Sequence, residues 1–181
     1  MTDGTGDVRF SGMAIPVPQG FDHVEWVGRW DRMQRRYLVR REERFAVMVE
    51  LVRAVAPTPG AIIDLGCGSG SLTLRLAEAF PQAAIVGIDF DPTMLVLARA
   101  RLAALGERVH LLCRDLRRKD WTDGLPAPID AAVSATALHW FSPQQLAGLY
   151  RQLAGVMRKP FIRKFTILAD CIRIEIAENR R

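Results

Sequence analysis

The feature that most constrains the fold of this chain is a short apolar segment that runs directly into a glycine-rich turn. Residues 61–65 read AIIDL, and Gly66, Gly68 and Gly70 alternate in the five residues that follow. The apolar segment is too short for a helix and suits a buried strand. Glycines between a strand and a helix let the backbone approach a ligand closely and leave helix N–H groups aimed at it. The turn therefore predicts an α/β fold with a ligand site beside this strand.

The rest of the chain alternates between strand-like and helix-like segments. An Asp91-Pro92 pair suits a helix start, because Asp accepts free N–H groups and Pro fits the first helical position. Ser142 and Gln145 form a capping box for a later helix. The alternation predicts a Rossmann-like, doubly wound, mostly parallel sheet with helices on both faces. The expected strands are 61–65, 83–89, 108–113 and 129–135, and the expected helices are two within 22–56, then 72–80, 91–106 and 142–157.

A length of 181 residues is typical of a single domain. We expect a flexible N-terminal arm over residues 1–20 and one domain over residues 21–181. Within that domain, residues 21–57 are expected to form a helical cap and residues 60–157 the cofactor-binding core. Residues 158–181 form a C-terminal segment of different composition.

Composition excludes several classes of protein. Hydrophobic residues make up 49% of the chain and charged residues 25%, which is typical of a folded globular protein. The three cysteines are too few and too scattered for a disulfide framework or a metal site, and an odd number suits a reducing compartment. No apolar run reaches the roughly 18 residues of a membrane-spanning helix. We therefore expect a cytoplasmic protein without a metal ion or a membrane partner.

The net charge of +5 does not indicate a nucleic-acid partner. Residues 158–181 hold seven basic and three acidic side chains, so the other 157 residues carry a net charge of only +1. Nucleic-acid binding needs a basic stripe on the folded body. The arginine-rich stretch at 35–44 is interleaved with glutamates and is expected to be a solvated helix face.

The spacing of the turn indicates which kind of ligand it binds. Asp89 ends the second expected strand, 19 residues after Gly70, and a carboxylate there can accept hydrogen bonds from both hydroxyls of a ribose. This predicts a nucleoside-containing cofactor. The dinucleotide fingerprint is G-x-G-x-x-G, whereas Ser71 stands here where its third glycine would be. A nicotinamide-dependent oxidoreductase is therefore the less favoured alternative.

Four segments in this order and spacing resemble the motifs of the class I S-adenosylmethionine-dependent methyltransferases, in particular the small-molecule type. They are DLGCGSG (64–70), GIDFDPTML (87–95), RDL (114–116) and SATALHWF (134–141). The resemblance covers about Trp26 to Met157. It implies methyl transfer to a small-molecule acceptor, with S-adenosyl-L-methionine as the cofactor.

The resemblance also implies a set of cofactor-binding residues. Asp89 would hold the ribose hydroxyls, and Asp115 would accept a hydrogen bond from the adenine amino group. Phe90 and Leu116 would pack on the two faces of the adenine. From the residues alone, Asp115 could instead cap a loop and Phe90 could belong to the core. The remaining expected residues are Asp64, then Gly66, Cys67 and Gly68 beside the methionine part, and Ser134 and Ala135, whose backbone groups would face its amino end.

His139 is the candidate catalytic residue. It follows the fourth expected strand, on the edge of the sheet where ligands bind in such folds. A general base is needed only if the acceptor loses a proton during methyl transfer, and a purely structural histidine beneath a helix cap is the alternative. Trp26, Trp30 and Tyr37 recur at helical spacing and form either a lid over the cofactor or part of the core.

The C-terminal segment departs from the family. Arg158-Lys159-Pro160 is followed by Phe161, whereas the family has a glycine-containing turn and a fifth strand there. We therefore expect a chain truncated or altered after about residue 158, with incomplete C-terminal strands and an exposed sheet edge that favours oligomers. The alternative function is a catalytically inactive, methyltransferase-like protein that binds cofactor or a partner without turnover.

Overall fold

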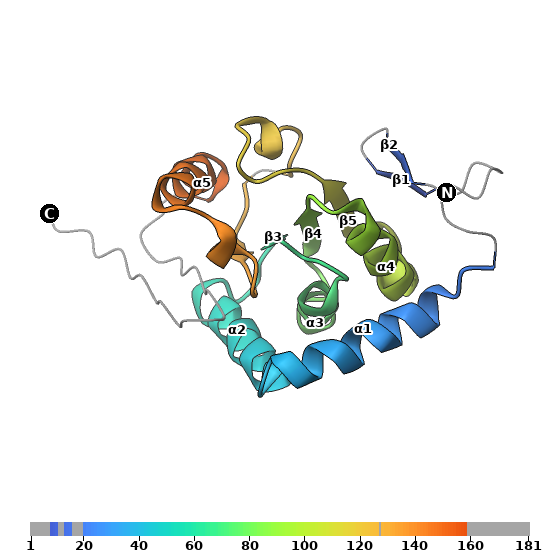
Figure 1. Ribbon diagram of the computed structural model, residues 1–181. Coiled ribbons are helices and arrows are strands. Elements are labelled where there is room, and N and C mark those ends of the chain that lie inside the picture. Colours follow the sequence, from blue (N-terminus) through green and yellow to red (C-terminus); the bar gives the residue numbers. More distant parts are fainter. Residues whose placement is uncertain (1–7, 11–12, 16–19, 127, 159–181) are drawn as a thin grey trace, which may run out of the picture.

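The computed structural model describes residues 8–10, 13–15, 20–126 and 128–158 (Figure 1). The C-terminal segment after residue 158, where incomplete strands and an exposed sheet edge are expected, lies outside these residues. So does most of the expected arm. Among the described residues, no helix is both long and apolar enough to cross a membrane.

The centre of the structure is a parallel four-stranded sheet in the order β5-β4-β3-β6. Sequential strands start in the middle of the sheet, extend to one edge and then return to the other side of β3. This reversal is the topological switch point at which ligands bind in open α/β sheets. The strands are β3 (Ala61–Leu65), β4 (Ala84–Asp89), β5 (Val109–Cys113) and β6 (Ala131–Val133).

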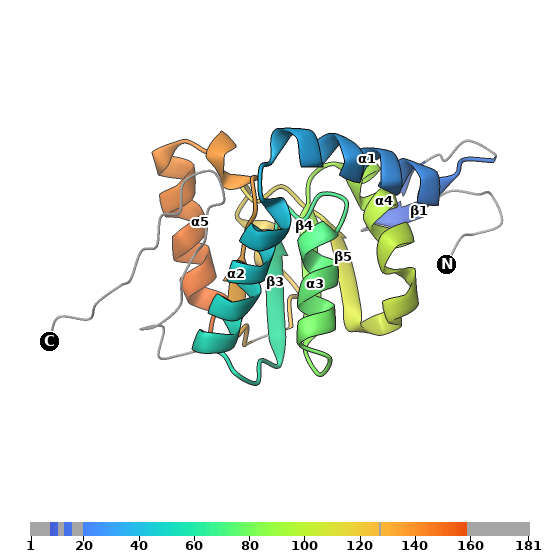
Figure 2. The same ribbon diagram turned by 90° about the horizontal axis from the view of Figure 1, so that it is seen from below.

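Helices cover both faces of the sheet, as predicted. Helices α2, α3 and α4 lie on one face and α5 on the other (Figures 1 and 2). Successive side chains of a strand point to opposite faces, so Ile62 packs among the residues of α2 and α3, whereas Ile63 packs among those of α5. The helices are α1 (His23–Tyr37), α2 (Arg41–Val55), α3 (Ser71–Ala79), α4 (Pro92–Leu102) and α5 (Pro143–Val156), with short 3-10 turns at Ala103–Arg108, Asp120–Thr122 and Leu138–Trp140.

Both helix starts that the sequence predicted are confirmed. The Asp91 carboxylate accepts a hydrogen bond from the Thr93 N–H at 2.8 Å, with Pro92 in the first helical position. The Ser142 hydroxyl and the Gln145 side chain form the reciprocal capping box. These local contacts fix where α4 and α5 begin.

Two elements differ from the sequence-based expectation. Strand β6 covers three of the seven residues expected at 129–135, and Ile129 makes a single bridge with Met157. Within residues 1–20, β1 (Val8–Phe10) and β2 (Met13–Ile15) pair antiparallel. Three-residue strands are too short to give an alternating pattern, which is why the sequence did not indicate them.

Helix α1 is the one long helix of the described chain without a buried residue. It contacts α4, and the Asp31 carboxylate holds it there through two hydrogen bonds of 2.9 Å from the Arg101 guanidinium. Figure 2 shows α1 running across the ends of α3 and α4. The possibility that Trp26, Trp30 and Tyr37 form part of the core is therefore wrong.

Candidate ligand-binding site

The glycine-rich turn lies where β3 meets β4 and the loop after β6. Gly66 has φ of 71°, and a Cβ atom there would lie 2.2 Å from the Ala137 Cβ. Gly68 has φ of 53°, and a Cβ atom there would meet nothing within 4 Å. Gly66 therefore allows the loop after β6 to pack closely, whereas Gly68 presents bare backbone to open space.

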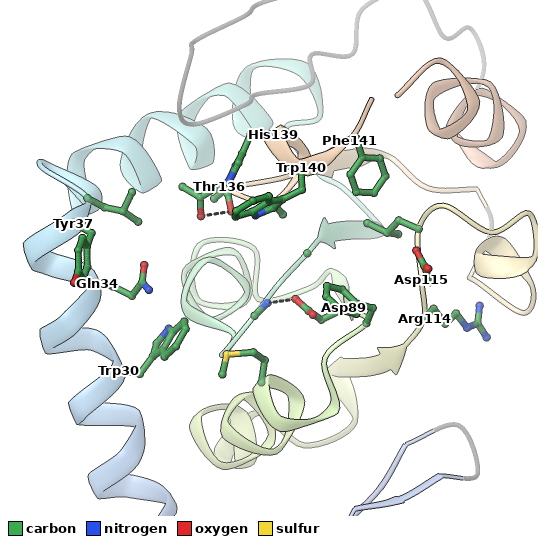
Figure 3. A pocket seen from close by; sticks show the side chains of 18 of the residues that line it. Trp30, Gln34, Tyr37, Asp89, Arg114, Asp115, Thr136, His139, Trp140 and Phe141 are labelled. Atoms are coloured by element: carbon green, nitrogen blue, oxygen red, sulfur yellow. Dashed lines mark hydrogen bonds between the residues drawn. The ribbon is translucent and has the colours of Figure 1, made fainter. Parts of the chain in front are cut away.

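A cavity of about 660 Å³ opens beside this turn, at the carboxyl ends of the strands (Figure 3). Cavities of about this size hold cofactors and small ligands. Figure 3 shows side chains of α1 on one side, Asp115 and Arg114 on the opposite side, and Asp89 between them. The lining consists of Trp30, Met33, Gln34, Tyr37, Leu38, Gly66, Gly68, Asp89, Phe90, Met94, the stretch 114–117, the stretch 135–137 and the stretch 139–141.

Asp89 is held at the end of β4 by backbone donors. Its Oδ2 accepts a hydrogen bond from the Gly68 N–H at 2.8 Å, and its Oδ1 accepts one from the Asp91 N–H at 2.9 Å. Burial raises the pKa of this carboxyl. Each carboxylate oxygen has further lone pairs, so Asp89 can still accept hydrogen bonds from two ligand hydroxyls.

Phe90, Asp115 and Leu116 line the same part of the large cavity. Phe90 is 69% exposed, so the alternative that it is a core residue is wrong. The Arg117 guanidinium donates to both oxygens of Asp115, at 2.7 to 3.0 Å, and these bonds hold the pKa of that carboxyl below its usual value. The Asp115 carboxylate therefore faces the cavity while paired with Arg117.

A second, smaller cavity of about 80 Å³ adjoins the first, and the two share Gly66, Gly68 and Ala135 among their lining residues. Asp64 and Cys67 line it. The buried Asp64 carboxyl accepts a hydrogen bond from the Thr73 hydroxyl at 2.7 Å, and burial raises the pKa of Asp64 to about 7.

Burial also raises the pKa of the Cys67 thiol. The thiol is therefore protonated at neutral pH, and a nucleophilic role does not suit it.

Three of the predicted residues, Ser134, Ala135 and His139, follow β6, and they differ in which cavity they line. Ala135 lines both cavities. Ser134 lines neither of them; its buried hydroxyl donates to the Leu65 carbonyl at 2.7 Å and ties the end of β6 to β3. His139 lines the large cavity, with its ring centroid 4.7 Å from that of Trp140.

Helix α1 contributes a wall of the cavity that the sequence analysis identified only in part. Trp30 and Tyr37 line the cavity, whereas Trp26 stacks on Phe21. Gln34 was missed, although it follows Trp30 by four residues and so shares its helix face. Thr136 was missed as well; it lines both cavities with φ of 58°, a conformation that is rare for a β-branched residue and that its sequence does not indicate.

No group of three or more metal-ligating side chains occurs among the described residues.

Comparison with known proteins gives a consistent result. The family model described as "Methyltransferase domain" matches residues 62–160. Trans-aconitate 2-methyltransferase of Rhodococcus jostii is 38% identical over 113 residues, which are 61% of this chain and 39% of the relative. Demethylmenaquinone methyltransferase of Thermus thermophilus is 38% identical over 103 residues, 56% of this chain and 46% of the relative. The matched part of the chain thus spans less than half of the length of these relatives.

Solved structures share the fold. CalS10 from Micromonospora echinaspora, an amino pentose methyltransferase solved with S-adenosylmethionine bound, superposes with a TM-score of 0.59 at 22% identity. The match covers 85% of this chain and 58% of CalS10. The S-adenosylmethionine-dependent methyltransferase SibL superposes with a TM-score of 0.52 at 28% identity, over 65% of this chain and 33% of SibL.

Proposed function

This chain belongs to the methyltransferase domain family, and from that premise we propose that it transfers a methyl group from S-adenosyl-L-methionine to a small-molecule acceptor. The observation that carries the proposal is the position of Asp89. It ends β4, is bonded to the Gly68 N–H of the turn and lines the large cavity at the switch point of the sheet. A carboxylate in this position suits a ribose, and the volume of the cavity lies within the range of small-ligand sites.

The residues present fit the cofactor. The open space in front of Gly68 admits a ligand against bare backbone, and Asp89 keeps lone pairs for the ribose hydroxyls. Phe90 and Leu116 offer apolar surface to the adenine, and both line the cavity. Asp115 is proposed to accept a hydrogen bond from the adenine amino group. Its carboxylate is paired with Arg117, so this pairing has to be shared or released when the adenine binds.

The methionine part of the cofactor is assigned to the side of the glycine-rich turn that lines the small cavity. Gly66, Cys67 and Gly68 would contact it through backbone atoms, and Asp64 and Ala135 would face its amino end. Ser134 lines neither cavity, so we propose that it acts on the cofactor by fixing the loop through the hydrogen bond from its hydroxyl to the Leu65 carbonyl.

When bound, S-adenosyl-L-methionine supplies a methyl group that its positively charged sulfur has already activated. The task of this chain is then to align the acceptor with that methyl group and to exclude water. Trp30, Tyr37 and Trp140 line the cavity and supply apolar surface for this task. A ring nitrogen of His139 is proposed to take the proton from an acceptor that must lose one.

The acceptor is proposed to be small, and the protein to act in the cytoplasm without a nucleic-acid or membrane partner. The excess of positive charge lies in residues 158–181 and not in the body of the chain. Two of the relatives are named for small molecules, trans-aconitate and demethylmenaquinone. No observation on the described residues favours the alternative of binding without turnover.

A turnover measurement tests the proposal. The protein is incubated with methyl-labelled S-adenosyl-L-methionine and a panel of carboxylic acids, phenols and amines, and label transfer and S-adenosylhomocysteine are quantified. We expect transfer to at least one acceptor class, its loss in Asp89→Ala, and its retention in Glu78→Ala, which changes an exposed carboxylate of α3 outside both cavities. Cofactor binding without transfer to any acceptor would contradict the proposed activity.

A further inference from the structure

The Arg117 guanidinium lies on the side of the large cavity where the adenine of the cofactor is proposed to bind. Its Nε–H and Nη2–H groups donate to the carboxylate oxygens of Asp115 at 2.7 to 3.0 Å. Its Cζ lies 5.9 Å from the centroid of the Phe90 ring, within the range of a cation–π contact. All three residues line the cavity. One side chain thus contacts two of the three residues that are proposed to hold the base.

A guanidinium and an adenine present similar groups to these two partners. Both are planar π systems that can lie against an aromatic ring, and both carry N–H donors at the edge of that plane. Adenine offers the N–H groups of its amino substituent, whereas Arg117 offers its Nε–H and Nη2–H. The two groups can therefore compete for the Asp115 carboxylate and for the exposed Phe90 ring.

The Asp115 carboxylate has little capacity for a further donor. Its Oδ1 accepts from the Arg117 backbone N–H at 2.9 Å and from the Arg117 Nε–H at 2.8 Å. Its Oδ2 accepts from the same Nε–H at 3.0 Å and from the Nη2–H at 2.7 Å. A carboxylate has about four lone-pair sites, so four bonds fill it. An incoming amino group therefore needs the guanidinium to withdraw.

The guanidinium is free to make this movement. The Arg117 side chain is 50% exposed, and the Asp115 side chain is 29% exposed. Turning outward brings the guanidinium into water, while the backbone N–H bond to Asp115 can remain. Exposed ion pairs of this kind are weak, so breaking the pair reduces the affinity for a ligand without abolishing its binding.

We propose that Arg117 takes the place of adenine in the ligand-free protein and has to leave Asp115 before the cofactor can bind, so that it sets the affinity of the site for adenine nucleosides. The inference rests on the proposed function, from which it takes the position of the adenine. Each ligand with an adenine then bears the cost of breaking the pair. A substitution that removes the guanidinium should accordingly tighten binding.

Titration calorimetry of Arg117→Gln tests the proposal with two ligands. S-adenosylhomocysteine and 5′-methylthioadenosine share the adenosine and differ in the amino-acid end. We expect Arg117→Gln to bind both about three- to tenfold more tightly than the unchanged protein, because neither ligand has to displace a guanidinium. The gain should agree between the two ligands within about twofold, because the effect is confined to the adenine.

Two further variants separate the contact from the charge. Arg118→Gln is the matched control: Arg118 lies outside both cavities and pairs with Asp120 at the same spacing, at 2.8 to 3.3 Å, so its loss should leave both affinities unchanged. Arg117→Lys keeps the positive charge but loses the planar fork. Its affinities should lie between those of the unchanged protein and those of Arg117→Gln.

The salt dependence of binding gives a second readout. Salt screens an exposed ion pair, and 5′-methylthioadenosine carries no charge of its own at neutral pH. The advantage of Arg117→Gln over the unchanged protein should therefore shrink by about half between about 50 mM and about 500 mM sodium chloride. An advantage that stays constant over this range would contradict competition by an ion pair.

Other results overturn the proposal. Unchanged or weaker binding of both ligands in Arg117→Gln would mean that Arg117 does not compete with the adenine, as would an equal gain in Arg118→Gln. An Arg117→Lys variant that binds like the unchanged protein would show that charge alone matters. The proposed function would stand in these cases, because both ligands still bind. Failure of both ligands to bind the unchanged protein and Arg117→Gln alike would overturn the proposed nucleoside site as well.

Discussion

The two halves of the large cavity are built differently. The half at the ends of β3 and β4 consists of backbone that hydrogen bonds hold in place. The Gly66 and Cys67 N–H groups donate to the Ile88 carbonyl at 2.7 and 3.0 Å, and the Asp89 carboxylate accepts a hydrogen bond from the Gly68 N–H. The half formed by α1 and the loop after β6 is an exposed rim. Tyr37 is 77% exposed and Trp140 82% exposed. We infer that the first half sets which cofactor binds, and that the rim can change with the acceptor at little cost in stability.

Among the substitutions that test this comparison, the largest loss of stability is expected at Gly66. In Gly66→Ala the new Cβ would clash with the Ala137 Cβ, and the positive φ would strain the backbone. We expect a loss of about 3 to 4 kcal/mol in the free energy of unfolding, measured by urea titration.

Gly68→Ala provides the matched control for this substitution. It has a similar positive φ but no atom within 4 Å of the new Cβ, so it should cost only about 1 kcal/mol in stability. Its new methyl group enters the cavity and should weaken the binding of S-adenosylhomocysteine. Equal stability losses in the two variants would show that close packing of the loop after β6 is not what requires Gly66.

The next effect concerns the pH dependence of stability. The pKa of Asp64 is raised from 3.8 to about 7 by burial, so the folded protein binds this proton more tightly than the unfolded chain. The resulting stabilisation is fully present below pH 3.8 and is lost as the pH rises through about 7. Relative to Asp64→Asn, the free energy of unfolding should therefore fall by about 3 kcal/mol between pH 5 and pH 8.

Urea titrations of both proteins at several pH values measure this difference. Asp64→Asn keeps an acceptor for the Thr73 hydroxyl, so the comparison isolates the charge. A difference that stays constant from pH 5 to pH 8 would show that the Asp64 carboxyl is not desolvated in the folded protein.

The smallest effect is expected on the rim. Trp140→Ala removes a side chain that is 82% exposed, and exposed substitutions change the free energy of unfolding by less than about 0.5 kcal/mol. Affinity for S-adenosylhomocysteine should change little, whereas the Michaelis constant for an accepted methyl acceptor should rise. If Trp140→Ala lost as much stability as Gly66→Ala, the contrast between a rigid half and an exposed rim of the large cavity would be contradicted.

The half of the cavity next to β3 and β4 could be predicted from the sequence because its signals are local. The strand at 61–65, the glycines after it and Asp89 depend on short-range patterning and on the alternation of strands and helices. The caps at Asp91 and Ser142 are equally local, since each is formed with a backbone N–H two or three residues further on.

The rim and the small cavity could be predicted only in part, because the positions of several of their residues depend on tertiary pairing. The burial of Arg41 follows from how α1 and α2 meet the turn, whereas its sequence neighbourhood is typical of a solvated face. The position of α1 follows from the long-range pairing of Asp31 with Arg101, 70 residues away. Ser134 was expected beside the cofactor through its backbone, but it lines neither cavity, and spacing does not reveal the hydrogen bond from its hydroxyl to the Leu65 carbonyl.

The most direct test of the central claim is a calorimetric titration of the protein and of Asp89→Ala with S-adenosylhomocysteine. We predict saturable binding to the unchanged protein and a loss of about a hundredfold in Asp89→Ala, because two charge-assisted hydrogen bonds to the ribose disappear. Glu78→Ala should bind as the unchanged protein does. A folded protein that binds no S-adenosylhomocysteine, or an Asp89→Ala variant that binds it equally well, would contradict the claim that the end of β4 holds the cofactor.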